Sequence, residues 1–425
     1  MKIRIENGHI LDPANNIDAT GDICIADGKI VSVAGENADF AADRSIDASN
    51  RLVIPGIIDL CARFREPGGE YKATINSESR AAASAGVTSI CCPPDTQPVI
   101  DTTAVVELIH QRAEMNHTRI FPLGALTHGL AGERLAEMKT LMAAGCAGIS
   151  NGNQPIRNSE VLRRAMEYAA GFDIPVFFYP EDYYLRNEGV IHEGATSTLL
   201  GLPPIPATAE TVAVSEALLL MEQAGVRLHL CRLSAARSVE LVAEAKNRGL
   251  PVTADTGICH LYLCDTDIGH YDTNLHLIPP LRSQQDKQAI TEGVSAGVID
   301  VICSDHQPHD DDAKAAPFSE TEPGASTIES LFPLVYQLTT DRGLSLMDAV
   351  AAITVKPARI LGIEHGTLGI NAAADIAIID TGIKYKVNKD QLLSAGKNTP
   401  FDGWQLTGRV SHTLLAGEVI YERDK

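Results

Sequence analysis

The residues best placed to do chemistry are polar side chains that directly follow short apolar segments of the sequence. They form the groups 59–65 (DLCARFR), 93–96 (PPDT), 150–153 (SNGN), 179–182 (YPED), 231–234 (CRLS) and 304–309 (SDHQPH). Carboxylates and imidazoles gathered at one site can hold a cation that activates water. Arg63, Arg65 and Arg232 are instead guanidiniums, which cannot ligate a metal. These groups therefore predict a pocket in which cations and carboxylates must be paired.

Conventional metal-ligand spacings are missing from the sequence. None of the thirteen histidines forms a His-x-His pair or an HExxH motif, and none of the nine cysteines forms a CxxC motif. The nearest spacing is His306-x-x-His309. The cysteines are odd in number and scattered through apolar segments, which is typical of reduced, buried thiols. The sequence therefore predicts neither a structural zinc knuckle nor a disulfide framework.

The polar groups must be positioned by the apolar segments before them, which alternate with Ala-rich helical windows. From Arg51 onward about eight strand–helix units follow one another over roughly 300 residues, as a closed (β/α)8 TIM barrel requires. In such a barrel the carboxyl ends of the strands meet at one mouth, which would gather the polar groups. A doubly wound open sheet is the alternative, but the sequence has neither GxGxxG after the first strand nor a Walker-type phosphate loop.

Short strand patterns at both ends of the chain predict a second, smaller domain. The first fifty residues contain MKIRIENGHI and DICIADGKIVSVAG, with Asp27-Gly28 as a hairpin turn. After the helical segment DAVAAITVKPARILG, strand patterns return in ADIAIID and RVSHTLLAGEVIYE. We therefore expect a small β-sandwich formed by residues 1–52 and 366–425, with the barrel over residues 53–365.

Charge and composition exclude several classes of partner. The 425 residues include 55 Asp and Glu against 35 Lys and Arg, a formal net charge of −20. Such a charge repels phosphate backbones and anionic membranes, and no Lys/Arg-rich run provides a local exception. Apolar stretches are interrupted before about 18 residues, and the first residues alternate as a strand does rather than as a signal peptide does. We expect a cytoplasmic protein that binds neither nucleic acid nor membrane.

Several motifs together resemble the dihydroorotase family of the amidohydrolase superfamily over essentially the whole chain. They are VIPGIIDL, REPG, AGVTSI, PPDTQP, CDTDIGHYDTNLHLIPPLR, SDHQPH and the terminal KNTPF with GW. The resemblance implies a metal-dependent (β/α)8 barrel that carries a β-sandwich assembled from both termini. It also implies an enzyme that interconverts carbamoyl aspartate and dihydroorotate.

The chain departs from the family pattern at the positions where the resemblance places metal ligands. The family's His-x-His-x-Arg motif is here Cys61, Arg63 and Arg65, so only its Arg is kept. The bridging carboxylate after the fourth strand is replaced by Asn151 or Gly152, the histidines after the fifth and sixth strands by Tyr179 and Arg232, and only Asp305 remains. Among the family's substrate contacts, Arg65 and the His309 motif position are present, whereas the two Asn positions are Asp95 and Ile278.

These departures predict a chain without the family's metal centre. Arginines at ligand positions would repel a divalent cation, and without that cation the pKa of water does not fall from about 15.7 toward about 7. We expect Arg63 and Arg232 to neutralise Asp305, with Asp59 or Glu181 as further partners, while Tyr179 is an aromatic filler whose hydroxyl is satisfied locally. We also expect no cofactor, no stoichiometric metal, and Asp305 and His309 as vestigial catalytic positions.

The resemblance implies a noncatalytic role in pyrimidine biosynthesis, because inactive dihydroorotase-like chains assemble with the catalytic chain of aspartate carbamoyltransferase. A homodimer is expected as well. One alternative is an active cyclic amidohydrolase of dihydroorotase or hydantoinase type, with a single zinc held by Cys61, Asp305 and either Cys231 or Cys259. Another is a binding protein that holds an anionic pyrimidine precursor through Arg63, Arg65 and Arg232.

Overall fold

A computed structural model describes residues 1–35, 39–114 and 116–423 of the chain. Eight parallel strands form a barrel: β6 (Ile57–Asp59), β7 (Val87–Cys92), β8 (Arg119–Ala125), β9 (Gly148–Ser150), β10 (Val176–Phe178), β13 (Leu228–Leu230), β14 (Val252–Gly257) and β15 (Val301–Cys303). Their order is β15-β14-β13-β10-β9-β8-β7-β6. An isolated bridge joins Ala62 to His306 just beyond the first and last strands, so the barrel is nearly closed.

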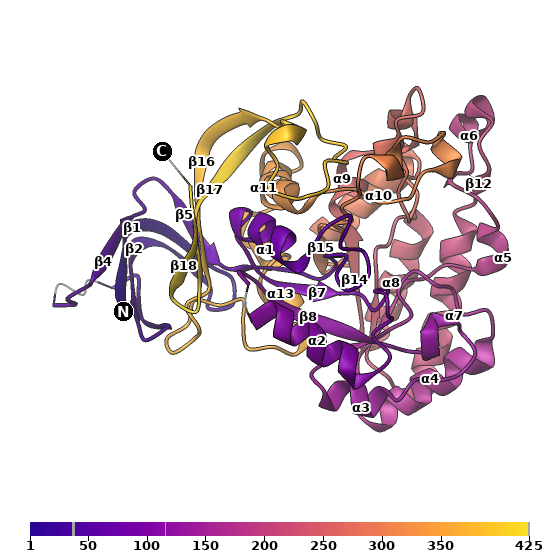
Figure 1. Ribbon diagram of the computed structural model, residues 1–425, viewed down its shortest axis with the longest axis horizontal. Helices are drawn as coiled ribbons and strands as arrows, with labels where there is room; N and C mark the ends of the chain where they lie inside the picture. Colours follow the sequence, from indigo (N-terminus) through magenta and orange to yellow (C-terminus); the bar gives the residue numbers. More distant parts are fainter. Residues whose placement is uncertain (36–38, 115, 424–425) are drawn as a thin grey trace.

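Helices surround the barrel on its outer side (Figure 1). The longer ones are α1 (Ile75–Ser84), α2 (Thr103–Glu114), α4 (Ser159–Gly171), α7 (Thr208–Ala224), α8 (Ala236–Asn247), α10 (Gln284–Ser295) and α11 (Leu331–Asp341). In α4 the side chain of Asn158 caps the first turn. The same helix buries residues at helical spacing against the strands, namely Leu162, Ala165, Met166 and Ala169. The Ala-rich windows of the sequence are therefore the barrel's outer layer.

Shorter elements lie in the connections between these units. They are the helices α3 (Met138–Ala143), α5 (Tyr183–Arg186), α6 (Ala195–Leu200), α9 (Ile258–Tyr262), α12 (Leu346–Ala351) and α13 (Val355–Leu361), and the strand pair β11 (Ile191–His192) and β12 (Pro204–Ile205). Among the described residues no helix has both the length and the hydropathy to cross a bilayer.

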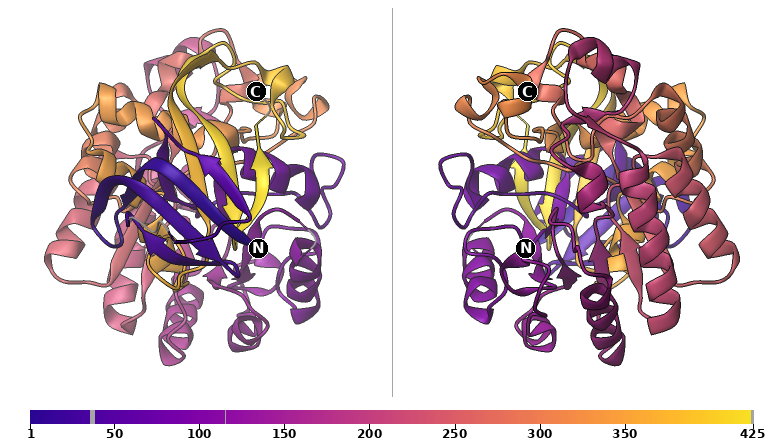
Figure 2. Two further views of the ribbon diagram at one scale, coloured as in Figure 1. Left: turned by 90° about the vertical axis from the view of Figure 1, so that its left-hand side faces the viewer. Right: turned by 90° about the vertical axis from the view of Figure 1, so that its right-hand side faces the viewer.

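Strands from both ends of the chain form a second sheet. Its members are β1 (Lys2–Asp12), β2 (Ile17–Ala26), β3 (Lys29–Val33), β4 (Arg44–Asp47), β5 (Leu52–Pro55), β16 (Ile376–Lys386), β17 (Gln405–Leu415) and β18 (Glu418–Glu422). The antiparallel pair β5–β16 joins the N-terminal to the C-terminal strands. These strands lie side by side, indigo beside yellow, in Figure 2. The predicted barrel with a β-domain from both termini is confirmed.

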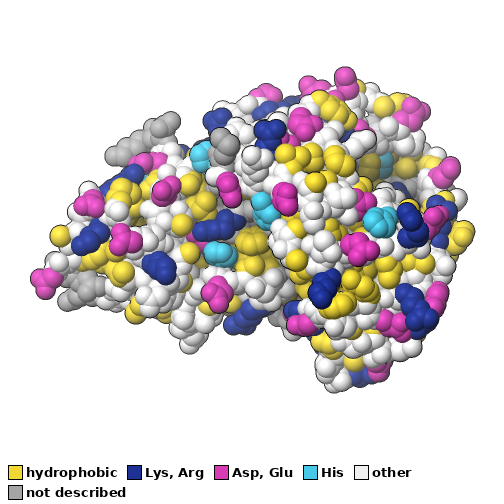
Figure 3. Space-filling view, turned by 60° about the horizontal axis from the view of Figure 1, so that its bottom comes forward, with side chains coloured by type: hydrophobic (Ala, Val, Ile, Leu, Met, Phe, Trp, Pro, Cys, Tyr) yellow, Lys and Arg dark blue, Asp and Glu magenta, His cyan; other side chains and the backbone are white. Residues whose placement is uncertain are grey.

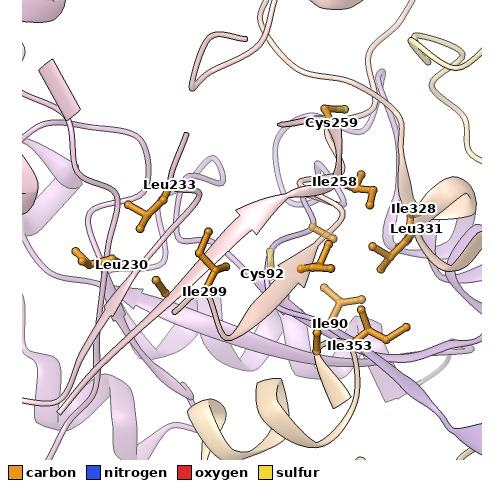
Figure 4. Packing of buried hydrophobic residues seen from close by; sticks show 14 of the residues in the cluster. Ile90, Cys92, Leu230, Leu233, Ile258, Cys259, Ile299, Ile328, Leu331 and Ile353 are labelled. Atoms are coloured by element: carbon orange, nitrogen blue, oxygen red, sulfur yellow. The ribbon is translucent and has the colours of Figure 1, made fainter. Parts of the chain in front are cut away.

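Side-chain alternation along the strands separates two apolar layers. Ile58, Cys91, Phe177 and Cys303 face the inside of the barrel and form one buried cluster. Their neighbours Ile57, Ile90, Val176 and Ile302 belong to the larger cluster between strands and helices. Figure 4 shows part of this larger cluster, including Ile90 and Leu230. Because residues alternate between the two faces of a strand, the inward positions near the carboxyl ends project toward the mouth.

Candidate functional site

The carboxyl ends of the barrel strands hold a buried cluster centred on Asp305. Nη1 of Arg63 and Nη1 of Arg232 each lie 3.3 Å from Asp305 Oδ1. The two arginine side chains, the arginine pair below, are 5% and 3% exposed. Both guanidiniums therefore point into the protein and share one carboxylate, as the sequence predicted.

A second shared acceptor completes the arginine pair. Nη2 of Arg63 and Nη2 of Arg232 donate to Oδ1 of Asn153 at 2.9 and 2.5 Å. Nε of Arg63 also donates to Asp95 Oδ2 at 2.8 Å. Asn153 was in a predicted polar group but had no predicted role. Its position two residues beyond Asn151, on the same strand-end loop, was the signal available in the sequence.

The charges in this cluster balance. Burial alone would lower the pKa of Arg63, but Asp95 beside it raises that pKa above its ordinary value. Burial likewise opposes the charge of Arg232, and Asp305 raises its pKa. Burial alone would raise the pKa of Asp95, but the Arg63 guanidinium holds it below its usual range. Two guanidiniums thus face two carboxylates, and the Arg63–Asp95 pair stabilises the charged form of both its members.

The donor set around Asp305 does not fit a divalent metal. The carboxylate oxygen Oδ1 already accepts from the arginine pair, from Gln307 Nε2 at 3.1 Å and from the Cys61 thiol at 3.4 Å. A guanidinium carries only donors and stays protonated, so it offers a metal no lone pair. Burial raises the pKa of the Cys61 thiol well above its ordinary value. The arginine pair takes the place of a cation.

Tyr179 and Asn151, which the resemblance led us to expect as replaced ligand positions, have structural contacts. The Arg232 guanidinium lies 4.5 Å from the centre of the Tyr179 ring, a cation–π contact. The Tyr179 hydroxyl donates to Glu181 at 3.3 Å. Asn151 accepts from Thr127 Oγ1 at 2.7 Å and donates to two backbone carbonyls, of Leu130 and Gln154. Tyr179 is therefore more than the predicted filler, and Asn151 fixes neighbouring loops.

Two carboxylates proposed as partners of the arginine pair serve elsewhere. Asp59 is fully buried and accepts from the Ser304 backbone at 3.0 Å, and burial raises its pKa to about 6. Glu181 forms its ion pair with Arg186 at 3.2 Å. The predicted contribution of Asp59 and Glu181 is corrected, because Asp95 and Asn153 reach the guanidiniums instead.

The retained substrate-contact positions lie beside a small pocket. This pocket has a volume of about 150 Å³ and is lined by Arg63, Arg65, Lys72 and Asp95, among others. Arg65 donates to the Pro308 carbonyl at 3.0 Å, and its Nη2 lies 2.9 Å from His309 Nε2. Burial, together with Arg65 and the nearby lysines, lowers the pKa of His309 to about 2. The imidazole is therefore neutral at physiological pH.

Motif residues outside the cluster hold its loops. Glu78 accepts from His306 Nε2 at 2.7 Å and from the Ala395 backbone at 2.9 Å, with both ionisable side chains fully buried. Asn398 of the KNTPF motif accepts from the His309 backbone at 2.9 Å and donates to the Gln307 and Gly324 carbonyls. His306 and Asn398 of the sequence motifs therefore position loops, and the role of Glu78 was not predicted.

Three residues of the mouth have left-handed backbone conformations. The φ angles of Arg65, Arg232 and Asp305 are 63°, 55° and 48°. Such conformations are unfavourable for side chains other than glycine and concentrate at functional sites. These conformations therefore mark the barrel mouth as a candidate functional site.

Comparisons with known proteins agree with this geometry. Residues 50–238 match the family model described as dihydro-orotase-like, and residues 222–421 match the amidohydrolase family. A dihydroorotase-like protein of Pseudomonas aeruginosa is 44% identical over 99% of this chain and 100% of its own length. A dihydroorotase of Anaeromyxobacter dehalogenans is 41% identical, covering 99% of this chain and 98% of its own.

Solved structures match the fold. An L-hydantoinase from Arthrobacter aurescens superposes with a TM-score of 0.89 over 100% of this chain and 96% of its own, at 24% sequence identity. At this level of sequence identity, the structural similarity supports the fold and says nothing about catalytic activity. Taken with the relatives of higher identity, it shows that the chain belongs to the dihydroorotase-like proteins of the amidohydrolase superfamily.

Proposed function

We propose that the chain is a noncatalytic dihydroorotase-like protein of pyrimidine biosynthesis that scaffolds or stabilises aspartate carbamoyltransferase. The observation that carries the noncatalytic part is the arginine pair on Asp305. Hydrolysis of the family type needs a cation to lower the pKa of water. Here two permanent cations without lone pairs stand at the ligand positions.

The partner is inferred from family resemblance, and the intact frame supports it. The barrel, the β-domain and the loops held by Glu78 and Asn398 are all present, although the ligand side chains are replaced. Because the barrel, the β-domain and these loops are held by internal contacts, the chain can present an outer surface of fixed shape to a partner. We therefore expect its function to lie in a complex with the catalytic chain of aspartate carbamoyltransferase, with a homodimer of this chain as the assembling unit.

An activity assay tests the noncatalytic part. Dihydroorotate and carbamoyl aspartate are incubated with the purified full chain, with and without added zinc, and the related Anaeromyxobacter dihydroorotase is assayed in parallel. We expect no conversion above the uncatalysed background in either condition. Zinc-dependent conversion that Cys61→Ser or Asp305→Asn abolishes would overturn the proposal and support the single-metal amidohydrolase.

A co-purification experiment tests the partner. The full chain is produced together with aspartate carbamoyltransferase from the same source, and the complex is sized by light scattering. We expect one species containing both chains in a fixed ratio, and higher transferase thermal stability than without this chain. Independent elution of the two proteins at micromolar concentration would contradict the scaffold role.

The pocket beside Arg65 favours a second candidate, binding of an anionic pyrimidine precursor. Arg63, Arg65 and Lys72 line it, although Asp95 contributes a negative charge on the same wall. Calorimetric titration with carbamoyl aspartate and dihydroorotate tests this candidate. Heat that disappears in Arg65→Gln would support it, and no detectable heat at millimolar ligand would exclude it.

A further inference from the structure

Inside the barrel, next to the arginine pair, lies a second polar cluster formed by His229, Cys231 and Asp255. One candidate ligand atom from each, a ring nitrogen, a sulfur and a carboxylate oxygen, lies within 4.8 Å of the other two. Strand register explains this proximity. His229 of β13 is opposite Thr253 of β14 in a parallel pair, so Cys231 and Asp255, two residues further along, are neighbours on the same inward side.

Two of the three side chains are already held in orientation. His229 Nδ1 lies 2.8 Å from Thr253 Oγ1, and its Nε2 lies 2.8 Å from Asp255 Oδ2. The other carboxylate oxygen, Oδ1, accepts from the Arg232 backbone N–H at 2.6 Å. In metal sites a ligating histidine uses its second nitrogen for an outer partner, and ligating carboxylates are themselves hydrogen-bonded. His229 Nε2 and Asp255 Oδ2 thus face each other, and the Cys231 sulfur lies within 4.8 Å of a candidate ligand atom of each residue.

The charge of this cluster favours a cation. The His229 and Asp255 side chains are each 1% exposed. Asp255 pairs with His229 at 2.8 Å and, within the described ranges, with no lysine or arginine, because the guanidiniums of the arginine pair are directed to Asp305, Asn153 and Asp95. A buried carboxylate needs compensation. A divalent ion with one thiolate, one carboxylate and a neutral imidazole has no net charge.

The surroundings favour a thiophilic ion. Cys61, Cys91 and Cys303 share the barrel-interior cluster with Cys231, and the Cys303 thiol lies 3.6 Å from Asp255 Oδ1. Thiolate and imidazole ligands select zinc and similar ions over calcium or magnesium. We propose that His229, Cys231 and Asp255 hold one zinc or similar thiophilic divalent ion. On binding, the Cys231 thiol proton and any proton on His229 Nε2 leave to solvent.

This site is separate from the family's ligand positions, so it does not depend on the proposed function and gives the barrel no hydrolytic centre. It departs from the expectation that the chain holds no stoichiometric metal, which was drawn from the residue types at Cys61, Arg63, Asn151, Tyr179, Arg232 and Asp305. The sequence did not reveal it, because the three ligands come from two strands at spacings that match no motif.

Metal titration of the full chain tests the proposal. After chelator treatment, zinc is titrated against a chromophoric competitor, and cobalt is used as a spectroscopic probe. We expect one ion per chain and a thiolate-to-cobalt absorption band. Cys231→Ser should remove that band and weaken zinc binding at least about tenfold, and Asp255→Asn should weaken it similarly. Zinc should also protect Cys231, the half-buried thiol, from alkylation.

Matched cysteine variants decide where the ion sits. Cys259→Ser, a buried thiol outside the cluster, should leave binding unchanged. Loss of zinc in Cys61→Ser but not in Cys231→Ser would overturn the proposal by placing the ion beside Asp305. No retention at micromolar free zinc, or binding unchanged in both Cys231→Ser and Asp255→Asn, would also overturn it. Dihydroorotate hydrolysis is assayed separately, so failure here is distinct from failure of the proposed function.

Discussion

At the scale of single residues, the positive charges at the barrel mouth are carried by guanidiniums, which carboxylates balance. The side-chain contacts of Asp305 are two guanidiniums, an amide and a thiol. Each guanidinium has at least two acceptors, which repays its loss of water. The shared acceptors thus satisfy the terminal nitrogens of both guanidiniums, whereas Nε of Arg232 is buried without an acceptor among the described residues.

Asp305→Asn is expected to destabilise the fold. The substitution leaves two buried guanidiniums without their shared carboxylate, and breaking a buried ion pair costs about 3–5 kcal/mol. Because Asp95 still compensates Arg63, we expect a loss of roughly 3 kcal/mol in the urea-derived free energy of unfolding. Arg237→Gln, which breaks the exposed pair with Glu240, should change it by less than about 1 kcal/mol. Equal losses in the two variants would contradict the assignment.

His309 is expected to make stability depend on pH. Its folded pKa of about 2 lies below its ordinary value of 6.5, so between these values the unfolded chain binds a proton that the folded chain does not. Stability therefore falls as the pH drops below about 6.5, by about 1.4 kcal/mol per pH unit for one proton. Between pH 7 and pH 5, His309→Gln should lose about 2 kcal/mol less than the parent chain in urea titrations. Parallel curves would exclude this role.

At the scale of elements, a few buried carboxylates connect parts that are distant in sequence. Asp375, which precedes β16, pairs with Arg119 of β8 at 2.6 Å and with His365 at 3.0 Å, and it accepts from the Ala416 backbone. Burial alone would raise the pKa of Asp375, but His365 and Arg119 hold it below its ordinary value. This carboxylate therefore joins the β-domain to the barrel.

Asp375→Asn should weaken that junction. Hydrogen bonds to a charged group contribute about 1.5–3 kcal/mol, so we expect a loss of about 2 kcal/mol in unfolding free energy. Amide hydrogen exchange should also become faster in β16 and β17 than in the barrel strands. Asp173→Asn, at an exposed pair with Arg227, is the control and should leave both quantities nearly unchanged. Uniform exchange rates across the molecule would contradict a junction role.

At the scale of the whole molecule, the excess of acidic residues lies on a surface of mixed charge. Figure 3 shows Asp and Glu side chains interspersed with Lys and Arg over one face. The formal net charge of −20 still produces repulsion within the compact state. The charged mouth does not relieve it, because its cations and carboxylates compensate one another.

Salt should therefore stabilise the isolated chain. Screening shortens the range of charge repulsion to about 10 Å at 0.1 M ionic strength. Between roughly 0.02 M and 0.5 M NaCl we expect the melting temperature in differential scanning fluorimetry to rise by about 1 °C or more, equivalent to about 1 kcal/mol. KCl should produce the same rise, since screening does not depend on which monovalent cation is present. A flat or falling curve would contradict the repulsion argument.

The sequence by itself determined the architecture and the residue types that meet at the barrel mouth. Strand–helix alternation predicts the barrel because each strand must bury its apolar residues between helices and the interior. The types of Arg63 and Arg232 were sufficient to predict that a charge partner was needed, because a guanidinium is always protonated. Asp305 was named as that partner from its place at the end of another strand.

Only the tertiary structure decided which groups actually meet. Asn153 and Asp95, rather than Asp59 and Glu181, reach the arginine pair, because loop conformation sets the direction of a side chain and leaves no periodic signal in the sequence. The cluster of His229, Cys231 and Asp255 depends on the register of two parallel strands, in which paired residues are 24 positions apart in the sequence. These three side chains are close because β13 and β14 pair as neighbours in the barrel. No local spacing in the sequence encodes that pairing.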